Sequence, residues 1–304
     1  VEELLADRGI DAVYIAVPNA FHAPLAIQAL EAGKHVLLDK PFALDLDQAL
    51  QVAAAARASS ATFLLGMNQR YRSESQTIAQ LARDGLFGDI YHAKAFWLRR
   101  QGIPKLGTWF GSKELAGGGC LLDIGVHMLD LCLFVMDKWD PVSVSGTTYT
   151  RFGNRGLGEG SWGKSERAGI PFDVDDFATA LIRLADGSTV NLDVSWACHA
   201  ESGSRNDVHI YGDEAGASLY PAKIFRADPL RQDYDVIDAV APRCGLAHCD
   251  RFHNWIASIA GDEKPLTSLR QALTVQAILD GIYQSAATGA EVAIDRQRID
   301  QVLG

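Results

Sequence analysis

The sequence predicts an α/β fold in two parts: a doubly wound parallel sheet, then an α+β unit with a large mixed or antiparallel, open-faced sheet. Short apolar strands alternate with helices up to about residue 83, which is the pattern of a parallel sheet with helices on its faces. After residue 89, several strands follow one another with few helices between them, as in antiparallel or mixed sheets. A length of 304 residues also favours two domains. We therefore expect domains at 1–88 and 89–304.

In the first part, Ala12–Val17 is a continuously apolar run rich in β-branched residues, as expected for a parallel strand covered on both faces. The helix that follows ends at Gly33, a common helix stop. The expected strands of this part are 12–17, 35–38 and 62–67, and the expected helices are the tail at 1–8, then 22–32, 46–58 and 75–83. Ligands of open α/β sheets bind beyond the carboxyl ends of the strands, which are here 18–19, 39–41 and 68–71.

The second part is expected to be rich in strands. Residues Ala185-Asp186-Gly187 form a typical hairpin turn between two of them. The expected strands are 90–98, 142–150, 177–184 and 189–196, with 208–211, 235–240 and a short segment at 292–294 as additions, and the expected helices are 121–137, 247–260 and 268–288. A polar, glycine-rich stretch at 151–171 reads as a long loop that covers a site or meets a neighbouring molecule.

Charge and composition exclude several kinds of partner. The net charge of -10 and the pI near 5.2 argue against nucleic acid or an anionic membrane surface, because a polyanion would be repelled. No apolar run approaches the roughly 20 residues that a membrane span requires. The five cysteines include no Cys-x-x-Cys pair, and we expect no signal peptide. We expect a cytoplasmic protein with a small-molecule substrate.

A glycine run, Gly117 to Gly119, leads into a helix that carries Asp123 and His127. Residues four apart lie on one face of a helix, so a carboxylate there can orient an imidazole, which is suited to exchange a proton near neutral pH. Two alternatives remain open at this point. Asp123 can cap the helix while His127 packs, or Cys120 can join both as a zinc ligand set.

Three motifs together resemble those of the glucose-fructose oxidoreductase / inositol dehydrogenase (Gfo/Idh/MocA) family. They are Val17-Pro18-Asn19-x-x-His22, Asp39-Lys40-Pro41 and Gly118-Gly119-x-x-x-Asp123-x-Gly125-x-His127. The resemblance covers nearly the whole chain. It implies a Rossmann domain, a second domain that carries the substrate site and the oligomer interface, and an NAD(P)-dependent oxidoreductase of a sugar, cyclitol or related polyol. It also implies a homodimer or homotetramer.

The resemblance implies roles for particular residues. Lys40, Asp123 and His127 would be catalytic: His127 as acid/base, Asp123 as the carboxylate that contacts substrate or orients His127, and Lys40 as donor to the reacting oxygen or as rival base. Cofactor contacts would come from these strand-end residues: Pro18, Asn19, His22, Asp39, Lys40 and Pro41. Substrate contacts would come from Arg70, Trp109, Asp123 and His127, and no metal is required. For His22, capping or local packing is a nearly equal alternative.

The sequence departs from the family pattern in two ways. Asp39 replaces the family's glutamate before Lys40-Pro41, a shortening by one methylene. The Gly-x-Gly-x-x-Gly turn that holds the pyrophosphate, and the strand that selects NAD or NADP, are not in the sequence. We therefore expect the chain to be part of a longer polypeptide, with Ala12–Val17 as an apolar edge strand in this piece.

Three functions follow from this sequence: a hydride-transferring enzyme, a non-catalytic binding or assembly homologue, and an NAD-dependent glycosidase. The choice between NAD and NADP is left open. A further acidic group precedes an expected strand, and we expect its side chains to be exposed to solvent: Asp173, Asp175 and Asp176.

Overall fold

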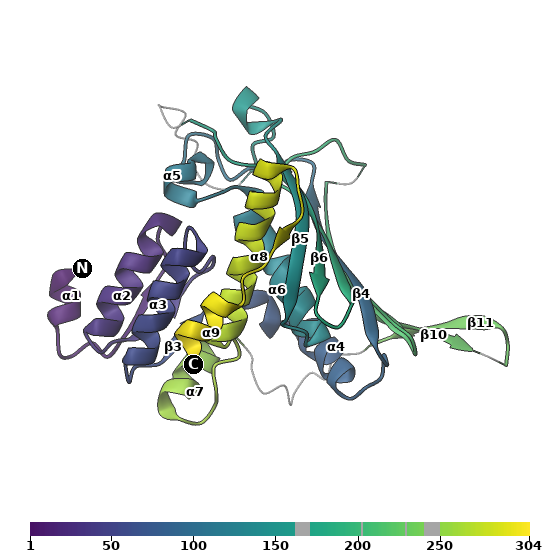
Figure 1. The fold of residues 1–304 in the computed structure, drawn as a ribbon, viewed down its shortest axis with the longest axis horizontal. Coiled ribbons are helices and arrows are strands. Elements are labelled where there is room, and N and C mark those ends of the chain that lie inside the picture. The colour runs from purple at the N-terminus through teal and green to yellow at the C-terminus, as the bar shows by residue number, and fades with distance from the viewer. Residues whose placement is uncertain (162–170, 202, 229, 240–249) are drawn as a thin grey trace.

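The structure, a computed structural model, describes residues 1–161, 171–201, 203–228, 230–239 and 250–304. Among these residues the chain forms one three-stranded and one nine-stranded sheet, and Figure 1 shows the arrangement of the helices around them. The strands of the first sheet end at Leu65, and those of the second begin at Ile90. These findings confirm the predicted α/β fold with a parallel sheet followed by a large mixed sheet. The domain boundary at residue 88 stays a prediction.

The small sheet is parallel, with strands in the order β1-β2-β3. Its strands are β1 (Ala12–Ile15), β2 (His35–Leu38) and β3 (Phe63–Leu65), and its neighbouring helices are α1 (Glu2–Ala6), α2 (His22–Glu31) and α3 (Leu46–Ala58). Asp45 begins α3 by accepting a hydrogen bond from the backbone N–H of Gln48 at 2.9 Å. As expected, β1 lies at the edge of this sheet, where Tyr14 is 40% exposed.

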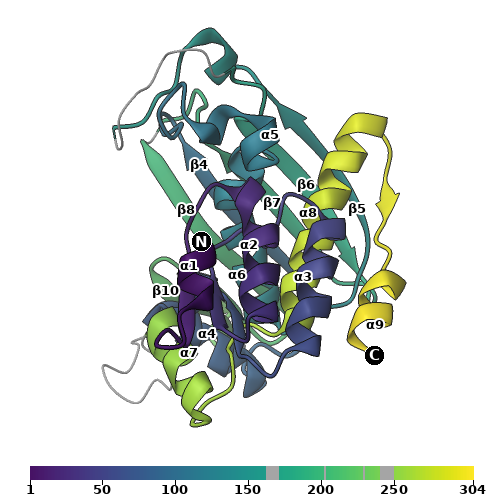
Figure 2. The same cartoon turned by 90° about the vertical axis from the view of Figure 1, so that its left-hand side faces the viewer.

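The two faces of the small sheet are covered by helices from opposite ends of the chain. Successive side chains of a strand point to opposite faces, so Val36 and Leu38 join the main core with α2 and α3. Leu37 and Leu64 instead contact Trp255 of α7 (Arg251–Ala260). Figure 2 shows α2 and α3 side by side, with α7 below them. The N-terminal sheet is therefore covered by a helix that comes after strands β4 to β11 of the second sheet in sequence.

The large sheet has the strand order β11-β10-β9-β8-β4-β7-β6-β5-β12. Its central pair, β4 and β7, is parallel, and the other pairs are antiparallel. The strands are β4 (Ile90–Arg99), β5 (Pro141–Tyr149), β6 (Phe177–Leu184), β7 (Thr189–Ser195), β8 (Ser204–Gly212), β9 (Gly216–Leu219), β10 (Ala222–Asp228), β11 (Asp233–Asp238) and β12 (Val292–Ala293). The sheet is therefore mixed, as predicted.

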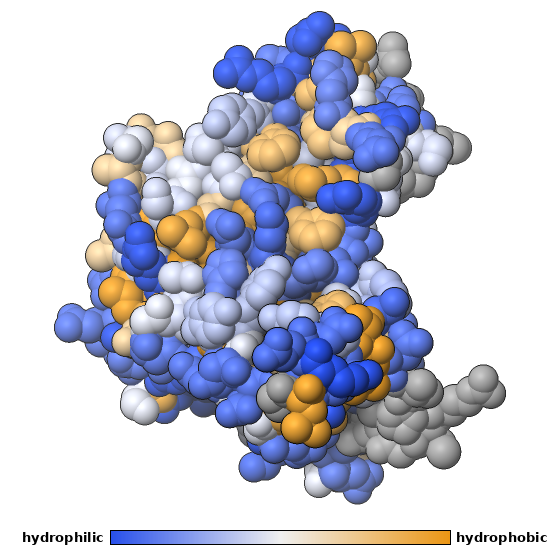
Figure 3. All heavy atoms as spheres, turned by 90° about the vertical axis from the view of Figure 1, so that its right-hand side faces the viewer, coloured by the Kyte–Doolittle hydropathy of each residue, from blue (hydrophilic) through white to orange (hydrophobic). Residues whose placement is uncertain are grey.

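Helices cover the large sheet on the side that faces the small sheet (Figure 1). They include α4 (Ser73–Arg83), α6 (Val126–Met136) and α8 (Leu269–Thr288), while α9 (Gln297–Leu303) packs against α3. In the described part of the chain no helix covers the opposite face of the sheet. Figure 3 views the molecule from that side, where apolar and polar residues are interspersed.

The expected elements differ from the observed ones mainly near the C-terminus. The pattern did not predict β9, β10 or α9, and β8 begins earlier than expected. The first residues of the predicted helix at 247–260 lie outside the described residues. The predicted helix at 121–137 begins with a π-helical turn, Leu121–Gly125, before α6.

One helical stretch among the described residues, Lys113–Met136, is long and apolar enough to cross a membrane by length and composition. No such stretch was expected from the apolar runs of the sequence. The most apolar window of this stretch is 94% buried inside the protein, because α6 lies between the large sheet and neighbouring helices. This is the environment of a core helix.

Candidate functional site

A cavity of about 300 Å³ lies at the carboxyl ends of β1 and β2, at the lower end of the size range of small-molecule sites. Eight of its lining residues were expected from the sequence to be site residues: Pro18, Asn19, His22, Asp39, Lys40, Pro41, Trp109 and Asp123. Phe110 and Trp196 also line the cavity, and Trp196 was not expected there. The structure thus brings three separate sequence motifs to one place.

Lys40 and Asp123 form an ion pair at this cavity. The Lys40 Nζ donates to Asp123 Oδ1 at 2.7 Å and to the main-chain oxygen of Asp123 at 2.8 Å. The two side chains are 18% and 17% exposed. An ammonium group has three N–H donors, and among the described residues Lys40 uses two, so one donor remains for a ligand oxygen.

Trp196 holds the other oxygen of the Asp123 carboxylate. Its indole Nε1 donates to Asp123 Oδ2 at 2.8 Å. Burial alone would raise the pKa of Asp123, but the charge of Lys40 and the hydrogen bonds from Lys40 and Trp196 outweigh it and lower that pKa. The carboxylate is therefore ionised at neutral pH and held on both oxygens.

His127 lies in the first turn of α6 and is 7% exposed. Burial, with the nearby charge of Lys40 in second place, lowers the pKa of His127 to about 3. The imidazole is therefore neutral at neutral pH, which is the form that can accept a proton. The predicted orientation of His127 by Asp123 is wrong. Both Asp123 oxygens are engaged elsewhere, and the buried Nδ1 of His127 has no hydrogen-bond partner among the described residues.

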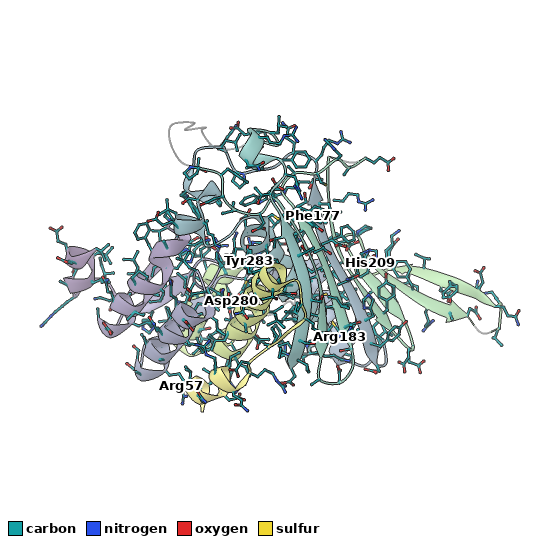
Figure 4. The ribbon with its side chains drawn as sticks, turned by 45° about the horizontal axis from the view of Figure 1, so that its top comes forward. Arg57, Phe177, Arg183, His209, Asp280 and Tyr283 are labelled. Carbon is teal, nitrogen blue, oxygen red and sulfur yellow. The ribbon has the colours of Figure 1, made fainter. Side chains whose placement is uncertain are left out.

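The π-helical turn that carries Asp123 is capped by Asp175. Its carboxylate accepts hydrogen bonds from the backbone N–H groups of Gly119 at 2.7 Å and Leu121 at 2.9 Å, and from the hydroxyl of Tyr283 at 2.7 Å. Figure 4 shows Tyr283 on α8, near Asp280. A Cβ at Gly119 would lie 1.8 Å from the main-chain oxygen of Asp175. Glycine is therefore required where the turn approaches the segment that precedes β6.

Asp173, Asp175 and Asp176 were expected to be exposed to solvent, and this expectation is wrong for Asp175 and Asp176. Asp175 and Asp176 are 5% and 0% exposed, and only Asp173 is exposed. Asp176 accepts hydrogen bonds from the backbone N–H groups of residues 151, 152 and 153. The carboxylates of Asp175 and Asp176 therefore accept hydrogen bonds from backbone N–H groups that have no main-chain acceptor at the start of a helix or loop.

The end of β1 reaches the cavity through Asn19 and His22. Asn19 Nδ2 donates to the main-chain oxygen of Ala116 at 2.8 Å, which ties this strand end to the segment before the glycine run. The ring of His22 is 1% exposed, and its two nitrogens face the main-chain oxygens of Pro41 at 2.8 Å and Val17 at 3.0 Å. A neutral imidazole donates through one nitrogen, so His22 bonds one of these two oxygens, and both nitrogens are directed at main-chain oxygens of the protein and not at the cavity.

Asp39 also has partners within the protein. Its carboxylate accepts hydrogen bonds from the Tyr14 hydroxyl at 2.9 Å and from the backbone N–H of Lys40 at 3.0 Å. Arg251 of α7 donates to the Tyr14 hydroxyl at 3.0 Å and lies 3.9 Å from Asp39. Helix α7 therefore reaches the carboxyl end of β2 with a positive charge, which no sequence motif indicated.

Trp109 and Phe110 form an aromatic wall of the cavity. Their rings are stacked, with centroids 3.8 Å apart and an interplanar angle of 23°. Both line the cavity. An aromatic face beside a carboxylate and an ammonium is suited to a ring-shaped polyol, which has an apolar C–H face and hydroxyl edges.

The predicted substrate contact of Arg70 is contradicted by the structure. Arg70 is 0% exposed and pairs with Asp130 of α6 at 2.5 Å. It also donates to the main-chain oxygen of Leu266 at 2.9 Å and to Gln271 at 2.8 Å. The guanidinium therefore joins three segments inside the protein and does not line the cavity.

The alternative zinc site is not supported either. The Cys120 thiol is buried against Asp175, at 3.2 Å, and the main-chain oxygen of Val194. Among the described residues no group of three or more His, Cys, Asp or Glu side chains converges for a metal ion.

Family comparisons match both parts of the chain. Residues 1–67 match the family described as "Oxidoreductase family, NAD-binding Rossmann fold", and residues 75–218 match the "GFO/IDH/MocA C-terminal domain". D-glucoside 3-dehydrogenase of Escherichia coli K12 is 30% identical over 284 residues, which cover 93% of this chain and 79% of that protein. The chain belongs to the Gfo/Idh/MocA family.

Other Gfo/Idh/MocA oxidoreductases extend the comparison. A putative UDP-kanosamine synthase oxidoreductase subunit of Amycolatopsis mediterranei is 28% identical over 295 residues, 93% of this chain and 81% of that one. A structure of levoglucosan dehydrogenase with NADH and levoglucosan has a TM-score of 0.80 at 22% identity, covering 97% of this chain and 82% of that chain. The latter likeness supports the fold alone. Membership makes the protein a dehydrogenase or reductase with a nicotinamide cofactor, as the sequence motifs predicted.

Proposed function

We propose that the protein transfers a hydride between NAD or NADP and a CH–OH group of a sugar, cyclitol or related polyol. The observation that carries this proposal is the cavity where the Lys40–Asp123 ion pair meets the aromatic wall of Trp109 and Phe110 at the carboxyl ends of the parallel strands. The similarity to D-glucoside 3-dehydrogenase supports the same substrate class.

The residues at the strand ends fit a nicotinamide dinucleotide. Pro18, Asn19, Asp39 and Pro41 line the cavity along the edge where dinucleotides bind in open α/β sheets. When bound, the nicotinamide ring supplies the hydride acceptor or donor. The chain's own residues must then hold the polyol, exclude water and move the hydroxyl proton.

Lys40, which lines the cavity, and His127, which follows Asp123 by four residues and does not itself line the cavity, have complementary properties for this task. The remaining N–H of Lys40 donates to the reacting oxygen and stabilises the negative charge that develops there. The neutral imidazole of His127 accepts the hydroxyl proton when an alcohol is oxidised and returns it when a carbonyl is reduced. Asp123 keeps Lys40 in place, and Trp109 takes the C–H face of the polyol ring.

We also infer a cytoplasmic homodimer or homotetramer that associates through the uncovered face of the large sheet. Large apolar or aromatic side chains on strands of that sheet remain exposed, among them Tyr91 at 54%, Tyr234 at 72% and Val236 at 60%. Apolar groups in a cluster of this kind favour association. Sedimentation velocity of the purified protein tests this, and a single monomeric species would contradict it.

The decisive experiment measures formation of reduced nicotinamide from NAD and, separately, NADP with a panel of neutral sugars and cyclitols. We expect Lys40→Met and His127→Asn to lower kcat by about 100-fold or more with a smaller change in KM. Lys138→Met is the matched control, because Lys138 is 20% exposed and paired with Asp89 and Asp186 away from the cavity.

Three results would contradict the proposal in different ways. Unchanged turnover in both variants would remove the assigned roles. Release of a cleaved glycoside without accumulation of reduced nicotinamide would favour the NAD-dependent glycosidase. Binding of a polyol without any turnover would favour the non-catalytic homologue.

A further inference from the structure

The Lys40–Asp123 pair presents a free N–H to the cavity only if the Asp123 carboxylate keeps one orientation. Asp123 lies in a π-helical turn and its side chain is partly exposed, so its own helix does not fix the carboxylate plane. The second oxygen is held by the indole of Trp196. We propose that Trp196 is a positioning residue, whose indole N–H fixes the Asp123 carboxylate and thereby aims the Lys40 ammonium at the reacting oxygen.

Trp196 is itself rigidly held. It is 0% exposed and comes directly after β7, where its backbone N–H donates to the main-chain oxygen of Asp176 at 2.9 Å. The Phe172 ring lies edge-on to the indole, with centroids 6.5 Å apart and an interplanar angle of 62°. A buried indole with a fixed backbone has few rotamers available, so its N–H direction is set by the fold.

The neutrality of the indole matters because charged groups already surround Asp123. Lys40 follows β2 and Arg99 ends β4, and the positive charges of both act on the Asp123 carboxylate. A second cation in place of the indole would compete with Lys40 for the carboxylate. The indole N–H is a donor without charge, so it orients Asp123 and leaves the ion pair to Lys40.

This inference rests on the proposed function, and its first test is Trp196→Phe, which removes the donor and keeps an aromatic ring. Loss of a hydrogen bond to a charged group should raise the pKa of Asp123. The acid limb of the pH profile of kcat/KM should then move up by about one pH unit, and kcat should fall about tenfold. Trp255→Phe is the matched control, since the buried indole of Trp255 has no hydrogen-bond partner among the described residues.

A double-mutant cycle tests whether Trp196 acts through Asp123. In an Asp123→Asn background, Trp196→Phe should change kcat far less than it does in the wild type, because the contact is already altered. Equal effects in both backgrounds would show that Trp196 acts on its own, and would overturn the proposal.

A spectroscopic measurement keeps the test independent of turnover. In protein labelled with ¹⁵N-tryptophan, the indole signal of Trp196 is identified by its loss in Trp196→Phe. It should move upfield in the proton dimension in Asp123→Asn, while the signal of Trp255 stays in place. A Trp196 signal that does not respond to Asp123→Asn would overturn the proposal. Absence of turnover by the wild type would instead refute the proposed function, and the indole signal would then decide whether Trp196 holds Asp123.

Discussion

Replacement of Asp175 by alanine should destabilise the protein strongly, because this buried carboxylate serves several donors at once. It accepts hydrogen bonds from the backbone N–H groups of Gly119 and Leu121, from the Tyr283 hydroxyl and from the Cys120 thiol. Alanine would remove this acceptor from the two backbone N–H groups and the Tyr283 hydroxyl, while the Cys120 thiol would keep the main-chain oxygen of Val194. Hydrogen bonds to a charged group contribute about 1.5–3 kcal/mol each, but removal of the buried charge offsets part of the loss. We expect the free energy of unfolding to fall by about 3–5 kcal/mol.

Urea denaturation followed by tryptophan fluorescence and circular dichroism measures this loss. Asp173→Ala is the matched control two residues away, since Asp173 is exposed and accepts one hydrogen bond, from the backbone N–H of Lys113 at 2.7 Å. Its loss should cost at most about 1 kcal/mol. If the two variants were equally stable, the conclusion that Asp175 holds the π-helical turn would be wrong.

Two further predictions concern buried charges elsewhere. Burial raises the pKa of Asp280 to about 6 in the folded protein, from 3.8, although hydrogen bonds from Leu46 and Gln276 oppose this. The folded state therefore binds more protons than the unfolded state between these values, and stability is lost as pH rises through this window. Above pH 6, Asp280→Asn should be about 2–3 kcal/mol more stable than the wild type, and below pH 4 the two should be similar. Urea denaturation midpoints at several pH values measure this. A difference in stability between the two proteins that stays constant with pH would contradict the prediction. Arg70→Met should cost about 3–5 kcal/mol by leaving Asp130 buried and unpaired, and the double variant with Asp130→Leu should recover part of the loss in the same assay.

Local patterns predicted the regular elements of the small sheet well. The observed limits of β2 and α3 coincide with the predicted 35–38 and 46–58, because a short apolar strand and the Asp45 cap leave clear signals at their ends. The strands β9 and β10 carried no such signal. Glycine, serine and charged residues interrupt their apolar pattern, and the register of each is set by pairing with a neighbouring strand.

Cavity-lining residues were anticipated where they belong to sequence motifs, and contacts were missed where one partner belongs to no motif. Lys40 and Asp123 were expected together and meet at the cavity. The hydrogen bond from Trp196 joins residues 73 positions apart, and nothing near either residue indicates it. Arg70 was misread because its partner Asp130 belongs to no sequence motif that would have indicated a buried ion pair. The sequence identified charged residues near strand ends, but only the fold distinguishes a buried ion pair from a ligand contact.

The covering of the small sheet by α7 has a consequence for synthesis of the chain on the ribosome. One face of that sheet, with Leu37 and Leu64, packs against Trp255, which is translated long after both strands. Until then this apolar face has no cover, and a nascent chain with exposed apolar strands is prone to aggregate or to bind chaperones. Fragments that end before α7 should therefore be poor folding units, and the N-terminal sheet matures only after strands β4 to β11 of the large sheet have been translated.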